Sequence, residues 1–461
     1  MVTLYQNKIQ EQLHRMMKTA NANTSFISVN EKTDSVDPLH FFHLGEEFSL
    51  GHRFFWSDPA NEAVYVGLGC IYSIEVWQHE NRFMEVERQW KRFIEQVLFE
   101  QKGRGPLLFG GFSFDPLKAK TERWVNFPEA KMIIPMMVLS IVKGESSITI
   151  TIPAKNNEEE LQRIEQMLAL LQQETIVPYE HNATCVKMFE IEKDEWLTAV
   201  TKATSDIRNG ELGKVVLARE ARLLFEKRIN PTIVLKRLRE QQPFSYIFAF
   251  ESGSDCFLGA SPEQLVKKDD DMCYSTCLAG SIRRGKTLKE DEELGNWLLQ
   301  DSKNLYEHRF VVDMIKEAML EVCDEVIIPD QPSLLKMRDI QHLYTPVKGF
   351  SRQPISLLSL VERLHPTPAL GGTPRSKALQ KIREIEPLDR GWYASPIGWL
   401  DAKGNGEFAV AIRSGLLQGN EASIFAGCGI VGDSDPLSEY EETKVKFKPM
   451  LSALGGRENE S

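Results

Sequence analysis

Two glutamates and a lysine near the carboxyl end of the chain have the spacing of one face of a helix. Glu439, Glu442 and Lys446 stand at i, i+3 and i+7, and a helix beginning at Pro436 would present all three on one side. Neighbouring carboxylates attract a cation, and a hard ion such as Mg²⁺ suits them better than Zn²⁺ does. Exposed acids are also common on solvated helix faces. The spacing leaves a magnesium site and an ordinary acidic surface as alternatives.

A glycine-rich stretch precedes this helix. Gly427, Gly429 and Gly432 match the pattern G-x-G-x-x-G after an apolar strand. In a dinucleotide-binding fingerprint the helix begins within the motif and an acid follows about 20 residues later. Here a turn containing Pro436 intervenes, and the corresponding position is Ser452. We expect no nicotinamide or flavin, whereas the backbone N–H groups of residues 427–429 could bind an anion such as a carboxylate.

Polar residues also interrupt two apolar patterns upstream. Arg413 ends an apolar strand, and a buried arginine needs an anion, which either a carboxylate ligand or a structural ion pair could supply. Asp301 and His308 fall on the apolar stripe of a predicted long helix over residues 294–319, where polar groups need partners. Glu307 lies beside His308, and a satisfied core histidine is an equal alternative to a functional one.

The overall composition is that of a globular protein with a large core. The chain has 461 residues, of which 42% are hydrophobic and 26% charged. A net charge of −11 argues against a nucleic-acid partner. The seven cysteines are scattered, which predicts neither a disulfide framework nor a zinc site and favours the cytoplasm. We find no secretion signal or membrane-spanning run, and expect a protein without a membrane association.

The elements that must position these residues are mostly short strands. Residues 1–20 have a helical pattern, and β-like runs then dominate to residue 152, with a helical insertion over residues 77–101. A helix beginning at Asn157 ends this part, and a polar stretch over residues 176–187 follows. We predict an N-terminal β-rich part, residues 1–180, and a second part, residues 185–455, packed as one compact unit.

Seven motifs in the second part resemble those of one family. They are Gly213-Lys-Val-Val-Leu-Ala-Arg219, Phe257-Leu-Gly-Ala-Ser-Pro-Glu263, Leu278-Ala-Gly-Ser281, Tyr306-Glu-His308, Leu364-His-Pro-Thr-Pro-Ala369, Gly391-Trp-Tyr393 and the stretch from Gly427 to Glu442. In order and type they resemble the chorismate-utilising enzymes, and within them the isochorismate synthases. The likeness covers residues 190–450 and is weaker before them. Ser395 departs from the pattern, since relatives usually have glycine there.

The resemblance implies a fold and a reaction. The fold would be an α/β (α+β) unit of two large antiparallel sheets stacked face to face, with helices outside and the site in a cleft between them. The reaction would add water at C2 of chorismate while the C4 hydroxyl leaves, which needs a base and an acid. The resemblance assigns the base to Lys214 and the acid to Glu263. Burial would lower the pKa of the lysine and raise that of the glutamate, as those roles require.

The resemblance also implies the ligands of the substrate and of one Mg²⁺ ion. Glu307 and Glu442 would hold the ion, with Glu439 adjacent, and the ion would grip the ring carboxylate. The residues expected to contact chorismate are Arg413, Tyr393, Gly427, Gly429, His365, His342, Ala369, Gly280 and Lys446.

Related activities remain as alternatives. By the same resemblance, relatives that make anthranilate or aminodeoxychorismate have glutamine in place of Lys214 and threonine in place of Ala369. The lysine therefore favours an enzyme that activates water rather than ammonia. A salicylate synthase, a siderophore-pathway isochorismate synthase and a non-catalytic carboxylate-binding regulator are further possibilities. We expect a monomeric enzyme of menaquinone biosynthesis that needs no protein partner.

Overall fold

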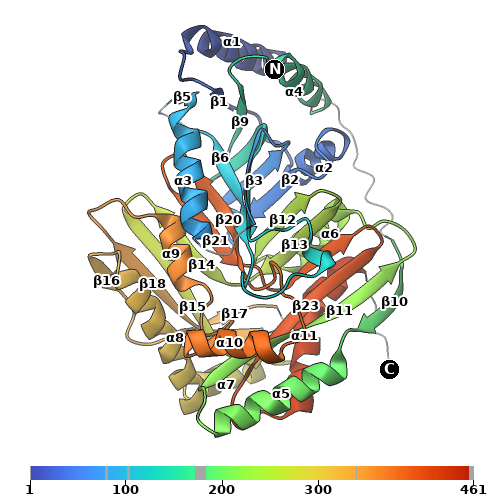
Figure 1. Cartoon of the computed structure of the whole chain (residues 1–461), viewed down its shortest axis with the longest axis vertical. Helices are drawn as coiled ribbons and strands as arrows, with labels where there is room; N and C mark the ends of the chain where they lie inside the picture. The colour runs from blue at the N-terminus through green and yellow to red at the C-terminus, as the bar shows by residue number, and fades with distance from the viewer. Residues whose placement is uncertain (1, 78–80, 101–103, 172–182, 339, 456–461) are drawn as a thin grey trace.

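The computed structural model describes residues 2–77, 81–100, 104–171, 183–338 and 340–455, with only the backbone of residues 2–7. Within these ranges the strands form one sheet of 13 strands and one of 10, and helices cover the outside (Figure 1). Mixed α/β architecture with two large sheets was the predicted fold class, and it is confirmed.

The first sheet combines strands from both ends of the chain. Its order is β10 (Cys185–Glu190), β11 (Lys214–Phe225), β23 (Glu421–Ile430), β22 (Ser414–Gln418), β13 (Asp255–Ser261), β12 (Tyr246–Ser252), β2 (Arg53–Ser57), β3 (Ala63–Leu68), β8 (Met137–Val142), β9 (Glu145–Pro153), β1 (Phe26–Lys32) and β5 (Val97–Phe99), with β19 (Gly372–Thr373) on β11. Its neighbours are antiparallel except β1 and β5, which are parallel.

The second sheet has the same mixed origin. Its order is β16 (Glu325–Ile327), β18 (Ile340–Phe350), β15 (Met272–Arg283), β14 (Gln264–Asp269), β21 (Gly406–Val410), β20 (Pro396–Asp401), β6 (Leu107–Phe112), β7 (Ala130–Ile134) and β4 (Tyr72–Val76), with β17 (Ser333–Lys336) on β18. The N-terminal strands join the later ones at β2–β12 in one sheet and at β6–β20 in the other. Each half of the chain therefore supplies strands to both sheets.

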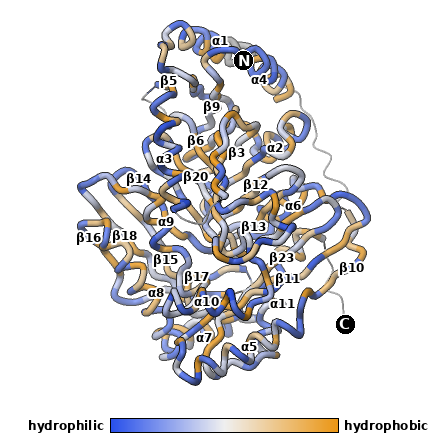
Figure 2. The backbone as a smooth tube through the Cα atoms, in the orientation of Figure 1, coloured by the Kyte–Doolittle hydropathy of each residue, from blue (hydrophilic) through white to orange (hydrophobic). Residues whose placement is uncertain are grey.

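Aromatic side chains fill the space between the sheets. Phe54 on β2 packs against Phe109 on β6 with ring centroids 4.3 Å apart, and Tyr65 on β3 packs against Trp399 on β20 at 4.5 Å. All four side chains are buried. The central strands β3, β6 and β20 carry hydrophobic colour in Figure 2. Burying such rings between two sheets contributes to the stability of this core.

Helices cover the outer faces of both sheets. On the first sheet these are α1 (Val2–Thr19), α2 (Pro38–Phe48), α6 (Pro231–Gln241) and α11 (Pro436–Leu454), with α4 (Glu158–Leu170) beside α2. On the second sheet they are α3 (Arg82–Glu95), α7 (Leu288–Leu298), α8 (Ser302–Leu320) and α9 (Leu357–Leu364). Helices α5 (Lys193–Arg208) and α10 (Arg375–Ile385) pack against β11 and each other. None of the described helices is both long and apolar enough to span a bilayer.

Two sequence expectations were wrong in detail. The single helix predicted over residues 294–319 is two helices, α7 and α8, because Asp301 caps the start of α8 by accepting a hydrogen bond from the Asn304 N–H. The helical insertion predicted over residues 77–101 is the shorter α3 followed by strand β5. Most of the predicted boundary, residues 176–187, lies outside the described residues.

Candidate active site

A cavity of about 500 Å³ collects most of the predicted functional residues. It is bordered by β11, β15, β18, β23, α8 and α11, with loops that follow β13, α9 and α10. Its lining includes Lys214, Glu263, Gly280, Glu307, His342, Ala369, Tyr393, Arg413, Gly427, Gly429, Glu442 and Lys446. Two predicted residues, His365 and Glu439, do not line it. The sequence motifs therefore converge on one cavity from segments more than 200 residues apart.

Lys214 enters the cavity from the first residue of β11. The neighbouring strand β23 pairs with β11 in antiparallel register, which places Val216 opposite Gly429. A Cβ atom on Gly429 would lie only 2.6 Å from Cε of Lys214, so the glycine leaves room for the lysine side chain. The ammonium group is 3.5 Å from a carboxylate oxygen of Glu307, and the lysine side chain is 20% exposed.

The glycines belong to a strand rather than to a loop. Strand β23 continues through Gly427 and Gly429 to Ile430, while its pairing with β22 stops at Ile424. Beyond that point one edge of β23 is free to border the cavity. Part of this edge is already used, because the Gly427 carbonyl accepts a hydrogen bond from Lys446 Nζ at 2.8 Å.

Glu263 enters the cavity just beyond β13. Its N–H donates to Ser261 Oγ, and its carbonyl accepts from the Val410 N–H, so the backbone is fixed on both sides. Burial raises the pKa of Glu263 to about 8. Among the described residues no side-chain partner for its carboxyl group is found. At neutral pH the group is therefore mostly a neutral acid that faces the cavity, as a proton donor must be.

The three glutamates predicted at the magnesium site do not all face the cavity. Glu307 on α8 and Glu442 on α11 both line the cavity, and each faces an ammonium group, Glu442 at 2.7 Å from Lys446. Glu439 turns away and accepts a hydrogen bond from Ser434 Oγ at 2.6 Å. Burial, followed by repulsion from Glu442, raises the pKa of Glu439.

The donor set on the cavity nevertheless fits Mg²⁺. Among the described residues no group of three or more histidine, cysteine or acidic side chains is arranged to hold a metal. Magnesium usually takes only one or two protein carboxylates and completes its shell with water and ligand oxygens. The carboxylates of Glu307 and Glu442, the two residues expected to hold the ion, match that chemistry, whereas Glu439 does not line the cavity.

The three histidines singled out by the sequence have different surroundings. His342 on β18 lines the cavity and its Nδ1 lies 2.6 Å from Ser281 Oγ; burial, then Arg413 and Lys446, lower its pKa to about 3. His365 is buried outside the cavity, where its Nε2 donates to the Phe114 carbonyl at 3.0 Å. His308 is a satisfied core residue that donates from Nδ1 to the Ala279 carbonyl and accepts at Nε2 from Thr345.

Positively charged and phenolic groups line another part of the cavity. Arg413 has a left-handed backbone conformation, with φ of +51°, and donates to the Lys446 carbonyl at 3.2 Å. Arg390 also lines the cavity and forms a buried ion pair with Glu386 at 2.6 Å. Sequence reasoning did not select Arg390, although it directly precedes the Gly391-Trp-Tyr393 motif. It also missed Asn304, one helical turn before Glu307 on α8, which would place both on one face.

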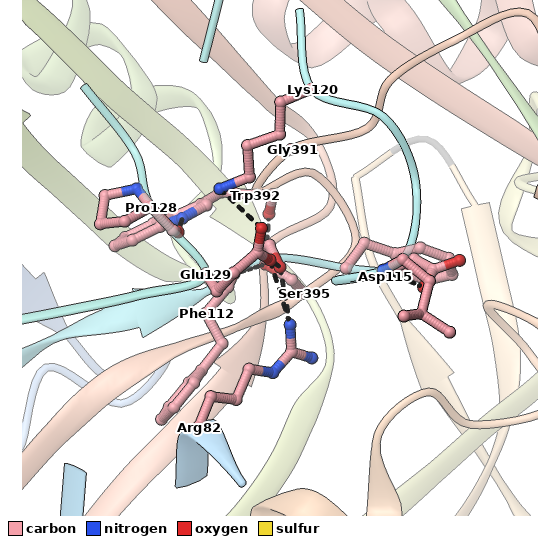
Figure 3. Close-up of polar contacts among 12 residues, drawn as sticks. Arg82, Phe112, Asp115, Lys120, Pro128, Glu129, Gly391, Trp392 and Ser395 are labelled. Carbon is pink, nitrogen blue, oxygen red and sulfur yellow. Dashed lines mark hydrogen bonds and ion pairs between the residues drawn. The ribbon is translucent and has the colours of Figure 1, made fainter. Parts of the chain in front are cut away.

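The segment that carries Tyr393 forms hydrogen bonds with the N-terminal half of the chain (Figure 3). Trp392 Nε1 donates to the Pro128 carbonyl at 2.9 Å, and Ser395 Oγ lies 2.6 Å from the Phe112 carbonyl. Ala394, between them, has φ of +60°. The hydroxyl of Ser395 thus joins this segment to β6.

Next to this junction lies a group of charged and hydroxyl side chains, buried except for Lys120, which we call the Arg82 cluster. It consists of Arg82, Ser113, Lys120 and Glu129. Arg82 Nη1 donates to Ser113 Oγ at 2.6 Å, and Glu129 lies 3.6 Å from Arg82 and 2.8 Å from Lys120 (Figure 3). Ser113 Oγ also donates to Glu129. Glu129 therefore accepts a hydrogen bond from Ser113 and lies close to two cations.

Comparison with known proteins places this arrangement in a family. Residues 11–455 match the family described as chorismate binding enzyme. The chain is 45% identical to isochorismate synthase MenF of Bacillus subtilis over 99% of both chains. It is 38% identical to the salicylate biosynthesis isochorismate synthase of Pseudomonas aeruginosa, over 93% of this chain and 91% of that one.

A solved structure agrees with these sequence matches. The menaquinone-specific isochorismate synthase MenF from Escherichia coli superposes with a TM-score of 0.81 at 25% identity, covering 96% of this chain and 98% of that one. The family match and the full-length relatives agree with the predicted motifs and with the fold. The chain belongs to the chorismate binding enzyme family.

Proposed function

We propose that this protein is an isochorismate synthase, which converts chorismate to isochorismate. The observation that carries the proposal is that Lys214 and Glu263 line the same cavity, with the glutamate held as a neutral acid by burial. The full-length relatives from B. subtilis and P. aeruginosa both carry the name isochorismate synthase. The same motifs led to this assignment from the sequence.

The reaction needs one proton to be removed from the water that attacks C2 and one to be given to the hydroxyl that leaves C4. Lys214 would take a proton from the water that adds at C2, and Glu263 would give a proton to the C4 hydroxyl as it leaves. With a pKa of about 8, Glu263 is protonated in roughly nine of ten molecules at pH 7. After each turnover the lysine has gained one proton and the glutamate has lost one, so both must be reset.

Substrate carboxylates would be held at the positive and metal-binding parts of the cavity. Arg413, Tyr393 and Lys446 supply donors for one carboxylate. Glu307 and Glu442 would hold a Mg²⁺ ion, which neutralises the charge of the dianionic substrate and withdraws electrons from the ring when bound. Lys214 lies 3.5 Å from the Glu307 carboxylate and Lys446 lies 2.7 Å from the Glu442 carboxylate. The proposed base is therefore next to a proposed metal ligand.

The biological setting of the proposal rests on the relatives. Of these, the MenF proteins of B. subtilis and E. coli are matched over nearly the whole chain, and the E. coli protein is described as menaquinone-specific. We therefore propose a role in menaquinone biosynthesis. All seven cysteines are free thiols, which suits the reducing cytoplasm. We also propose that the enzyme acts as a monomer without an obligatory protein partner.

Product analysis tests the proposal directly. The purified protein is incubated with chorismate and Mg²⁺, and the products are separated and identified by mass and ultraviolet absorbance. We expect isochorismate without release of pyruvate, and loss of activity when EDTA removes the metal. Formation of salicylate with pyruvate would identify a salicylate synthase instead. Binding of chorismate without any product would support the non-catalytic alternative.

Glu442→Gln tests the metal site separately from the reaction. We expect this variant to need a higher Mg²⁺ concentration for half-maximal rate, because one anionic ligand becomes a neutral amide. Glu441→Gln is the matched control, since Glu441 is exposed on the same helix and does not line the cavity. An equal magnesium requirement in both variants would remove Glu442 from the ligand set.

A further inference from the structure

A second, smaller cavity lies behind His342 and borders the active-site cavity. Its volume is about 40 Å³. It shares five lining residues with the active-site cavity: Pro262, Ile340, His342, Arg413 and Val445. Pro262 directly precedes Glu263, so the small cavity reaches the strand end that carries the proposed acid.

The small cavity also borders an open depression at the surface. Gln242 and Ser245 line the small cavity and a surface cavity of about 360 Å³, which lies along α6. Gln242 is the residue that ends α6, and Ser245 precedes β12. The small cavity therefore shares lining residues with the active-site cavity on one side and with the surface cavity on the other.

Two buried polar atoms in this passage have no partner among the described residues. They are Nε2 of His342 and Nε2 of Gln242. Each of the two residues is only 8% exposed. Leaving a polar atom buried without a hydrogen bond costs about 1–3 kcal/mol, so such atoms are normally satisfied by ordered water. A water molecule needs roughly 10–15 Å³ of such space, and the cavity is large enough for at least one.

We infer that ordered water in this passage, bound by Gln242 and His342, connects the Glu263 side of the active site with solvent. The inference rests on the proposed function. Water is consumed on the lysine side, and the leaving hydroxide becomes water when it takes the proton of Glu263. Each turnover therefore needs a way out for one water molecule and a source of one proton for the Glu263 carboxylate. A water-filled passage beside Pro262 supplies the exit for water and the source of the proton, and neither has to pass through the part of the cavity that binds the substrate.

Gln242→Leu tests the passage, because leucine has similar bulk but cannot bind water. We expect kcat to fall about tenfold, a fraction of the effect of a direct acid or base, with KM for chorismate within about twofold. The solvent deuterium isotope effect on kcat should increase, because resetting the proton becomes slower. Gln300→Leu is the matched control: this exposed glutamine lines none of the three cavities and should leave both quantities unchanged.

The outcomes separate this inference from the proposed function. If the wild-type protein makes no isochorismate, the proposed function fails and the passage fails with it. If the wild type is active and Gln242→Leu keeps the wild-type kcat and isotope effect, only the passage is refuted. A rise in KM alone would also refute it, since that is an effect on substrate binding. Should the variant fail to fold, a high-resolution crystal structure of the wild type decides: we expect water within hydrogen-bond distance of both Nε2 atoms, and a dry cavity would overturn the inference.

Discussion

Two buried polar regions meet at the 390–395 segment and differ in how their charges are satisfied. In the Arg82 cluster, Arg82 and Lys120 both contact Glu129, and Ser113 joins Arg82 to Glu129 by hydrogen bonds. In the active-site cavity, by contrast, the Glu263 carboxyl group has no side-chain partner among the described residues. A satisfied network stabilises a fold, whereas an unsatisfied buried acid costs stability and keeps a shifted pKa available for chemistry.

The largest expected effect is on catalysis. Lys214→Ala and Glu263→Gln should each lower kcat about a thousandfold, because each removes a proton-transfer group. The Kd for chorismate, measured by calorimetry, should change little. Lys316→Ala and Glu317→Gln, at exposed positions of α8, are controls for the same two substitutions and should retain the wild-type rate. Wild-type turnover in either cavity variant would show that the roles are wrongly assigned.

The Arg82 cluster should show the opposite behaviour, with an effect on stability. Glu129→Gln leaves the buried charge of Arg82 without its carboxylate and should lower the free energy of unfolding by about 3–5 kcal/mol, measured in denaturant. Glu159→Gln breaks the exposed pair between Glu159 and Arg163 on α4, and should cost less than about 1 kcal/mol. Equal losses in the two variants would contradict the contrast between the regions.

Glu263→Gln should also stabilise the protein above acidic pH. The pKa of Glu263 is about 8 in the folded protein and near 4.5 when unfolded, so between these values only the unfolded chain releases the proton. Folding of the wild type therefore becomes less favourable as the pH rises from about 4.5 to 8, and glutamine has no proton to release. We expect the variant's advantage to grow from near zero at pH 4.5 to about 3 kcal/mol at pH 7. A pH-independent difference between the two unfolding curves would refute the shifted pKa.

The smallest expected effect concerns the junction between the two regions. Ser395→Ala removes the hydroxyl that reaches the Phe112 and Trp392 carbonyls and should cost about 1 kcal/mol of stability. Ser395→Gly should cost somewhat more, because glycine also increases the conformational freedom of the unfolded backbone. Thermal unfolding of the two variants side by side measures the contribution of the hydroxyl and that of the backbone. An unchanged midpoint in Ser395→Ala would mean that the hydroxyl contributes nothing to holding this segment.

The sequence was sufficient where a signal is local. The turn Asp433-Ser-Asp-Pro436 predicted the start of α11, and the structure confirms it with Asp435 as the cap and Pro436 as the first helical residue. Most of the site residues predicted from the sequence also line the cavity, because each motif is a short run of fixed chemistry. The break between α7 and α8 was missed, since Asp301 occupies an apolar position of the helical pattern and its capping role depends on the Asn304 N–H.

The amino-acid sequence by itself determined the residue types of the site, the family and the use of many short strands. Only the tertiary structure decided which of those residues face the cavity. Glu439 and Glu442 are one turn apart on α11, yet Ser434 holds the first outside and the second lines the cavity. His365 lies in a motif but faces Phe114. The direction of each side chain, its burial and the passage behind His342 arise from packing between segments that are distant in the chain. No local sequence pattern encodes these properties.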